Sequence, residues 1–306
     1  MIKKKISINN NKINFKKSKF VITKNTHFIF ILLFLIPPII TMSLRCFSMT
    51  LNEPLYEGML VKGKLNTDEK IWFNKRQIVP HSNGVFYFGI PQGHTDTLIL
   101  QYEKHTPTEI IKTQKKFEVK QQRWKETKIN GLQKNKVNIS TKNQERIKKE
   151  NILLNEKRTE YNKDFFPICF TRPIPSKKYR ISGDFGARRI LNGITGSGHS
   201  GTDYAAPTGT PIISPADGII VVAHNDMFLS GKTILINHGY GIFSSYSHLS
   251  KISVQSGKHI KRGEKIGEVG STGRSTGPHL HFTLTWFNIR VDPEQVFNNY
   301  PCIVSE

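Results

Sequence analysis

The chain has 306 residues, enough for two domains of ordinary size and a tail. Its 45 Lys and Arg residues against 23 Asp and Glu residues give a formal net charge of +22. Nucleic-acid binding is the first function that such a charge suggests. No helix-turn-helix, zinc-finger or aromatic RNA-binding signature accompanies the charge, so we expect no nucleic-acid partner. The excess lies mainly in residues 1–26 and across about 121–158. A basic flank of a membrane segment and attraction to an anionic wall or lipid surface account for it better.

Residues 27–46 are predicted to be a membrane anchor or signal segment that follows a basic cytoplasmic tail, residues 1–26. Phe28–Ser43 is apolar without a charge, and at about 16 residues it is short of the ~20 of a full span. The lysines before it keep the N-terminus inside and send the rest of the chain across. No small-x-small cleavage site follows, because Arg45 and Cys46 fit one poorly. We therefore expect export, with an uncleaved anchor favoured over a cleaved signal peptide.

Residues 53–120 show short alternating apolar runs, such as Ile71–Phe73 and Val85–Phe88, separated by turn residues. The Asn83-Gly84 pair is a strong hairpin-turn signal. This pattern predicts a small β-sandwich domain without a catalytic constellation. Its scattered histidines are expected on the surface or in turns: His81, His94 and His105.

Residues 121–163 are polar and rich in Lys, Asn, Gln and Glu. Within them, Asn143–Tyr161 is predicted to form a helix with mixed charges on its exposed faces. We interpret the segment as a partly helical linker.

Glycine-bounded β-runs dominate residues 165–300, for example Gly218–Ala223, Thr233–Ile236 and His281–Leu284. Helical periodicity is almost absent there. The pattern predicts a compact antiparallel β domain, and the whole chain is expected to be all-β in class.

The three cysteines, Cys46, Cys169 and Cys302, form no Cys-x-x-Cys pair, so a thiolate zinc site or a redox motif is not indicated. Arg45 argues against a lipoprotein cysteine at Cys46. Cys169 and Cys302 flank the C-terminal domain and can pair in an oxidising compartment. The sequence favours isolated reduced thiols.

Four histidines and one aspartate stand in local contexts that support one another. Gly201 and the Ala-Ala-Pro that follows place His199 and Asp203 in a strand or loop, where they converge if the backbone turns at Gly201. His279 and His281 share one face of a predicted strand, since side chains alternate along a strand. His248 lies at the end of another strand. The remaining histidines of this region are expected to be satisfied or exposed, with His238 able to hold a turn: His224, His238 and His259.

Zinc suits this set of side chains. Imidazole nitrogens and one carboxylate oxygen fill three tetrahedral positions, and a water in the fourth marks a catalytic site. The metal acidifies that water and polarises a scissile carbonyl. No His-Glu-x-x-His helix is present, so spare histidines would have to position the water and stabilise the oxyanion.

The run from Ile181 to Pro293 resembles the lysostaphin-like, LytM-type zinc metallopeptidases. The resemblance implies one zinc ion per chain, with His199, Asp203 and His281 as ligands and His248 and His279 as unligated catalytic histidines. The matching pieces include Ser182–Arg188, His199–Pro207, Gly209–Pro211, Ala216–Gly218, Tyr246–Ser250, Lys261–Glu264 and Gly270–Phe282.

The resemblance also implies a function, because members of this family cleave peptide bonds in peptidoglycan and the Gram-negative members act mostly as D,D-endopeptidases. The order of segments is similar to envelope members anchored in the inner membrane and facing the periplasm. One rival interpretation is a non-enzymatic activator of cell-wall amidases, against which the five filled positions argue. A second is a metallopeptidase that processes proteins.

Overall fold

The computed structural model describes residues 49–66, 68–94, 97–129, 140–175, 179–191 and 194–302. The predicted basic tail and membrane segment lie outside these residues. The described part is mostly β and contains two helices, α2 (Thr141–Lys157) and α3 (Pro293–Asn299), in agreement with the predicted class. None of its helices combines the length and the apolar character that a membrane crossing needs.

The first strands form three small sheets. Their orders are β1-β3-β6, β5-β4-β7-β8 and β2-β9. Alternation along β7 buries Leu98, Leu100 and Tyr102 on one face, as expected for a half-buried strand. The strands are β1 (Thr50–Leu51), β2 (Leu55–Tyr56), β3 (Leu60–Lys64), β4 (Glu69–Phe73), β5 (Arg76–Ile78), β6 (Val85–Gly89), β7 (Leu98–His105), β8 (Ile110–Phe117) and β9 (Val119–Lys120).

The predicted turn at Asn83-Gly84 is present, but it does not join a regular hairpin. Gly84 has a φ of +81°, and its N–H donates to the carbonyl of His81. The flanking strands belong to different sheets, because β5 pairs with β4 and β6 pairs with β3. The local turn signal is therefore correct, whereas strand pairing follows longer-range contacts.

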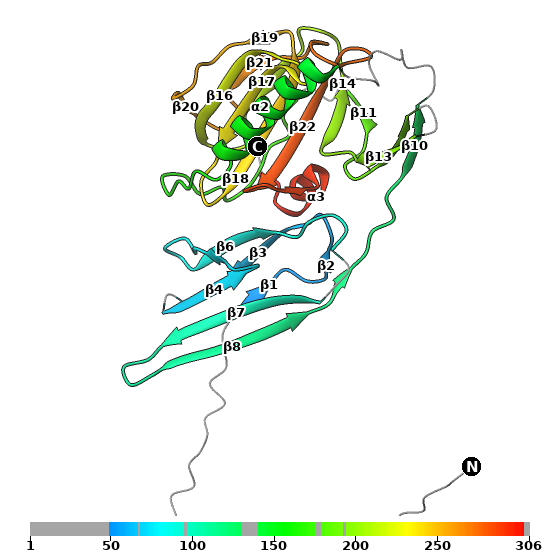
Figure 1. Ribbon diagram of the computed structural model, residues 1–306. Helices are drawn as coiled ribbons and strands as arrows, with labels where there is room; N and C mark the ends of the chain where they lie inside the picture. Colours follow the sequence, from blue (N-terminus) through cyan, green and yellow to red (C-terminus); the bar gives the residue numbers. More distant parts are fainter. Residues whose placement is uncertain are drawn as a thin grey trace, which may run out of the picture. The chain divides into compact units, whose positions relative to one another are not determined.

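The candidate site lies on the largest sheet, whose order is β11-β14-β22-β18-β17-β16-β20, with β23 beside β22. All of its pairings are antiparallel, which confirms the prediction for the C-terminal region. Figure 1 shows these strands in order. They are β11 (Arg180–Gly183), β14 (Thr202–Ala205), β16 (Gly218–Met227), β17 (Gly231–Asn237), β18 (Ile242–Leu249), β20 (His259–Ile260), β22 (His279–Trp286) and β23 (Ile289–Val291).

Two further small sheets are present beside the large sheet in sequence. One has the order β10-β12-β13, with β10 (Glu126–Ile129) parallel to β12 (Arg188–Leu191) and β12 antiparallel to β13 (Ile194–Gly198). The other has the order β15-β21-β19 and contains β15 (Pro211–Ile213), β19 (Lys251–Ile252) and β21 (Lys265–Glu268).

Helix α2 begins after Ser140, whose hydroxyl accepts a hydrogen bond from the Asn143 N–H and so caps a free backbone donor. The helix lies across one face of the large sheet and contacts β16 (Figure 1). The Glu150 carboxylate accepts from the Phe228 N–H at 2.9 Å, and Arg146 pairs with Asp226 at 3.0 Å. These two contacts fix the helix against the end of β16.

The structure corrects one prediction, because Cys169 and Cys302 form a disulfide rather than isolated thiols. Their neighbours explain the pairing. Phe170 and Pro301 form a parallel bridge, and the Phe170 N–H donates to the Tyr300 carbonyl at 2.8 Å. The two segments run side by side, so the Cα atoms of the cysteines lie 4.8 Å apart despite 133 residues between them in sequence.

Candidate metal centre

Strand register brings the first two predicted ligands together. Asp203 on β14 and His281 on β22 are directly opposite residues of an antiparallel pair, so their side chains leave the same face of the sheet. The Asp203 Oδ1 lies 2.7 Å from the His281 Nδ1. The pairing of β14 with β22 is therefore sufficient to create half of the site.

His199 reaches the same point from the segment that precedes β14. Its Nε2 lies 3.1 Å from the Asp203 Oδ1 and 3.1 Å from the His281 Nδ1. Backbone hydrogen bonds with Gly186 and Ala187 hold it there. These two residues belong to the Ser182–Arg188 motif, which explains the presence of that motif in the pattern.

The predicted turn at Gly201 allows this convergence. A Cβ at position 201 would lie 2.1 Å from the carbonyl oxygen of Phe282, so only glycine lets the chain pass this close to β22. His199 and Asp203 consequently meet without sharing a helix.

Further hydrogen bonds select which nitrogen of each histidine faces the centre. The His199 Nδ1 lies 2.9 Å from the Asp184 carbonyl oxygen, a contact in which Nδ1 carries a proton, and Nε2 is thereby directed toward Asp203 and His281. The His281 Nε2 lies 3.2 Å from both the Ser200 and the Thr283 hydroxyls. The His281 Nδ1 is thereby left toward Asp203. Such outer contacts orient histidine ligands in metal sites.

The centre is suited to a carboxylate that stays ionised. Burial opposes the ionised form of Asp203, but hydrogen bonds and positive charge from His199 and His281 outweigh it, and the pKa of Asp203 lies well below its usual value. An ionised carboxylate in a buried position needs a cation or hydrogen-bond donors around it.

The donor set fits a tetrahedral zinc ion. Ligand atoms about 2.0–2.1 Å from a tetrahedral zinc lie about 3.3 Å from one another. The three separations here are 2.7, 3.1 and 3.1 Å. Shifts of a few tenths of an ångström would therefore form one face of such a tetrahedron.

His279 lies beside this group because it is two residues from His281 on β22. Its Nε2 is 3.9 Å from the Asp203 Oδ1, and its Nδ1 is 2.8 Å from the Gly277 carbonyl oxygen. Leu280 between the two histidines is fully buried on the opposite face. The predicted alternation on this strand is thus present.

His248 reaches the groove through an unusual backbone conformation. Regular alternation along β18 would place Ser247 in the groove and His248 on the core face with Tyr246, which is fully buried. His248 instead has a φ of +65° and lines the groove together with Ser247. Its ring lies 4.8 Å from that of His279 and its Nδ1 is 2.7 Å from the Thr272 carbonyl oxygen. Burial lowers the pKa of His248 to about 4, so the ring is neutral near pH 7.

A groove of about 900 Å³ contains all five predicted residues. Strands of the large sheet form its floor, and α2 forms one wall. Sequence reasoning treated α2 as linker and missed this wall. The signal that identifies it is helical spacing, because its groove residues are three or four positions apart on one face: Ile147, Glu150, Asn151, Leu154, Asn155 and Arg158.

The other histidines of the described residues do not line the groove. His238 is fully buried, and its Nδ1 and Nε2 lie 2.8 Å from the Asp217 carbonyl oxygen and 2.7 Å from the Ser244 hydroxyl, so both ring nitrogens are satisfied, as predicted. His81 stacks on Phe166 and lies at the turn that the Gly84 N–H closes, in agreement with the predicted turn position. The remaining histidines do not line the groove: His94, His105, His224 and His259.

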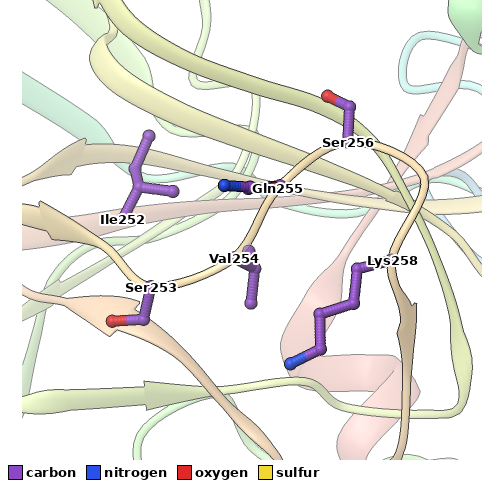
Figure 2. Close-up of a pocket in the computed structure, with 6 residues that line it drawn as sticks. All are labelled: Ile252, Ser253, Val254, Gln255, Ser256 and Lys258. Atoms are coloured by element: carbon purple, nitrogen blue, oxygen red, sulfur yellow. The ribbon is translucent and has the colours of Figure 1, made fainter.

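A second hollow, formed by the loop Ile252–Lys258, carries no comparable chemistry. Figure 2 shows its six side chains leaving the loop in different directions instead of converging. Its one charged side chain, Lys258, already pairs with Glu264 at 2.7 Å. The chemistry of the described residues is concentrated in the groove.

A groove with a His–Asp–His ligand group and two further histidines is a site of the metallopeptidase class. Comparison with known proteins agrees, because the model of peptidase family M23 matches residues 197–293, which include all five residues. This part of the chain is a peptidase M23 domain, which confirms the resemblance found in the sequence.

Curated relatives share this region. The peptidoglycan DD-endopeptidase ShyA of Vibrio cholerae is 42% identical over 125 residues, which cover 40% of this chain and 29% of the relative. The DD-carboxypeptidase/endopeptidase Mpg of Neisseria meningitidis is 47% identical over 117 residues, 38% of this chain and 27% of the relative. The chain thus spans less than a third of the length of either relative.

A crystal structure of a Pseudomonas aeruginosa protein assigned to peptidase M23 superposes with a TM-score of 0.59. It covers 81% of this chain and 97% of the other at 24% identity, which supports the fold.

Proposed function

We propose that this protein is a zinc-dependent endopeptidase that hydrolyses peptide cross-links of cell-wall peptidoglycan during wall growth or remodelling. The observation that supports this most strongly is the convergence of His199, Asp203 and His281 in a groove that also holds His248 and His279. The names of the related peptidoglycan DD-endopeptidases support the substrate.

In this proposal His199 Nε2, Asp203 Oδ1 and His281 Nδ1 hold one zinc ion. When bound, zinc supplies a water of lowered pKa and polarises the scissile carbonyl. Asp203, whose pKa lies well below its usual value beside His199 and His281, would supply an ionised carboxylate to the metal. The outer contacts of His199 and His281 keep the donor atoms aimed at one point.

His248 and His279 are proposed to move a proton and stabilise the transition state. The Nδ1 atom of each ring lies within 2.8 Å of a backbone carbonyl oxygen, a contact that places the Nδ1 proton there and leaves Nε2 as the nitrogen that can accept. A ring that takes a proton at Nε2 becomes a donor to the developing oxyanion. Glu150, the glutamate among the described residues of the groove lining, is already engaged by Arg146 and the Phe228 N–H, so the two histidines are the better candidates for the base.

The groove suits an extended peptide substrate. Its floor presents short hydroxyl side chains from β18 and β22, Ser245, Ser247 and Thr283, and these leave room for a backbone. The interpretation as a non-enzymatic amidase activator has less support, because such a module needs neither the ligand group nor the two spare histidines.

The proposal includes a position in the cell envelope. The Cys169–Cys302 disulfide supports an oxidising compartment. Residues 27–46 remain the predicted inner-membrane anchor, with the periplasm as the destination if the segment is cleaved. The proposed order of parts after it is a small β domain (53–120), a linker (121–163) and the peptidase domain (165–300).

The test is digestion of purified sacculi by the full-length protein, followed by analysis of the released muropeptides. We expect cross-linked dimers to disappear, the reaction to stop with a chelator and zinc to restore it. Persistence of the dimers with one zinc bound per chain contradicts the proposal. Stimulation of an added amidase without hydrolysis favours the activator, and cleavage of unfolded casein alone favours a protein-processing peptidase.

A further inference from the structure

Of the four arginines that line the groove, two, Arg158 and Arg290, lie away from the metal ligands. Arg158, at the C-terminal end of α2, donates from Nη2 to the Ser245 hydroxyl at 2.9 Å and from Nη1 to the Asn155 side chain at 3.4 Å. Arg290 on β23 is exposed and lines the same groove. Neither forms an ion pair with a described carboxylate.

The position of these arginines relative to the metal ligands follows from strand register. Ser245 on β18 is paired with Thr283 on β22, and Thr283 is two residues, about 7 Å, from His281. Arg290 is paired with Thr285, about 13 Å along β22 from His281. The arginines therefore lie at the end of the groove opposite His279. Their distance from His281 corresponds to two to four residues of an extended peptide.

Among the described residues, the groove lining provides no free carboxylate at this end. Its two acidic side chains are already engaged, Glu150 by Arg146 and the Phe228 N–H, and Asp203 by the histidines. The Arg158 Nε is buried and has no hydrogen-bond partner among the described residues. A buried donor without a partner costs stability and is typical of functional sites.

The protonation state of Arg158 also favours an anion as its partner. Burial, and then the charge of Arg290, lower the pKa of Arg158 to about 10. The side chain is still a cation near pH 7, and the proximity of a like charge makes an anion between the two favourable.

We infer that Arg158, assisted by Arg290, binds a carboxylate of the substrate peptide and thereby selects peptides with a free acid a few residues from the cleaved bond. This inference rests on the proposed function and adds a specificity determinant to it. Arginine suits the role because its fork of N–H donors matches a carboxylate. The carboxylate has two sources, the end of a peptide strand or a side group within it.

The experiment uses purified full-length, zinc-loaded protein and synthetic cross-linked peptide dimers in three forms. One form has all carboxylates free, one has only the terminal carboxylate amidated, and one has only the internal carboxylates amidated. Arg158→Gln is compared with Arg146→Gln. Both substitutions remove one charge and one tether of α2, but Arg146 does not line the groove.

We expect the wild type and Arg146→Gln to prefer the free acid by about tenfold or more in kcat/KM, chiefly through KM, because a charge-assisted hydrogen bond is lost on amidation. Arg158→Gln should cleave all forms equally, and Arg158→Lys should recover part of the preference. The amidated form that loses rate identifies the source of the carboxylate.

Equal cleavage of all forms by the wild type, or an unchanged preference in Arg158→Gln, overturns the inference while leaving the proposed function intact. If no dimer is cleaved, the proposed function fails. Binding of the same peptides then decides whether the carboxylate site exists. Acid-selective binding that Arg158→Gln abolishes then supports the carboxylate site, and its absence overturns it.

Discussion

Asp203 and His281 face one another as a register pair of β14 and β22, with Oδ1 and Nδ1 2.7 Å apart. Two donors that the sheet itself aligns form a prepared metal site, so loss of either should abolish binding. We expect His281→Ala to reduce zinc affinity by about 100-fold or more.

Zinc content by mass spectrometry of the native protein measures this effect. The control is His259→Ala, since His259 is exposed and does not line the groove. Full zinc content in His281→Ala would remove His281 from the ligand set.

His248 is expected to affect the rate rather than metal binding. Asparagine tolerates the left-handed conformation that position 248 requires, with its φ of +65°. His248→Asn should therefore fold and keep one zinc, while kcat falls by about 100-fold or more because a transition-state contact is lost. The measurement is turnover of a cross-linked dimer together with zinc content. Undiminished turnover contradicts the assigned role.

Gly201 should be sensitive to the smallest substitution. In Gly201→Ala the new Cβ would meet the Phe282 carbonyl at 2.1 Å, so β14 and β22 must separate. We expect a loss of about 1–3 kcal/mol in the free energy of unfolding and weaker zinc binding. Urea denaturation of Gly277→Ala serves as control, because a Cβ there meets nothing within 4 Å. Equal stability of the two variants would show that the close approach is not needed.

His238 predicts a pH dependence of stability. Burial, opposed by hydrogen bonding to Asp217, lowers its folded-state pKa to about 4, so the unfolded chain binds the proton more readily. The contribution of the neutral ring is complete above the unfolded pKa of about 6.5 and is lost as the pH falls toward 4. Between about pH 7.5 and 5 the loss should be on the order of 2 kcal/mol.

The comparison for that prediction is His238→Gln, in which all other titrating groups are retained. Its free energy of unfolding should change less over the same pH interval, although it is less stable near neutral pH. Parallel pH profiles for the two proteins would contradict a neutral, buried His238.

The disulfide should contribute to stability through the long loop that it closes. Cys169 and Cys302 are 133 residues apart, and closing such a loop typically stabilises a domain by about 2–5 kcal/mol. A reductant should lower the Tm of the wild type and leave that of Cys302→Ser unchanged. Equal Tm values with and without reductant in the wild type would contradict the bond.

Much of the site could be predicted from local sequence. The alternation of His279 and His281, and a turn at Gly201 between His199 and Asp203, follow from strand periodicity and from the conformational freedom of glycine. His248 was selected from its position at a strand end, but its role came from the family resemblance, since regular alternation places it on the core face. Its left-handed backbone conformation departs from regular strand geometry, and strand periodicity does not predict such a departure.

The sequence by itself determined the mostly β class, the peptidase motif and the identity of the candidate ligands, because each depends on residues near one another in the chain. Only the tertiary structure decided that Cys169 meets Cys302, that α2 forms one wall of the groove and that Arg158 lies there with no ion-pair partner among the described carboxylates. These features join segments about 80 residues or more apart in sequence. Their proximity is set by the packing of the helix and chain ends on the sheet, which no local pattern encodes.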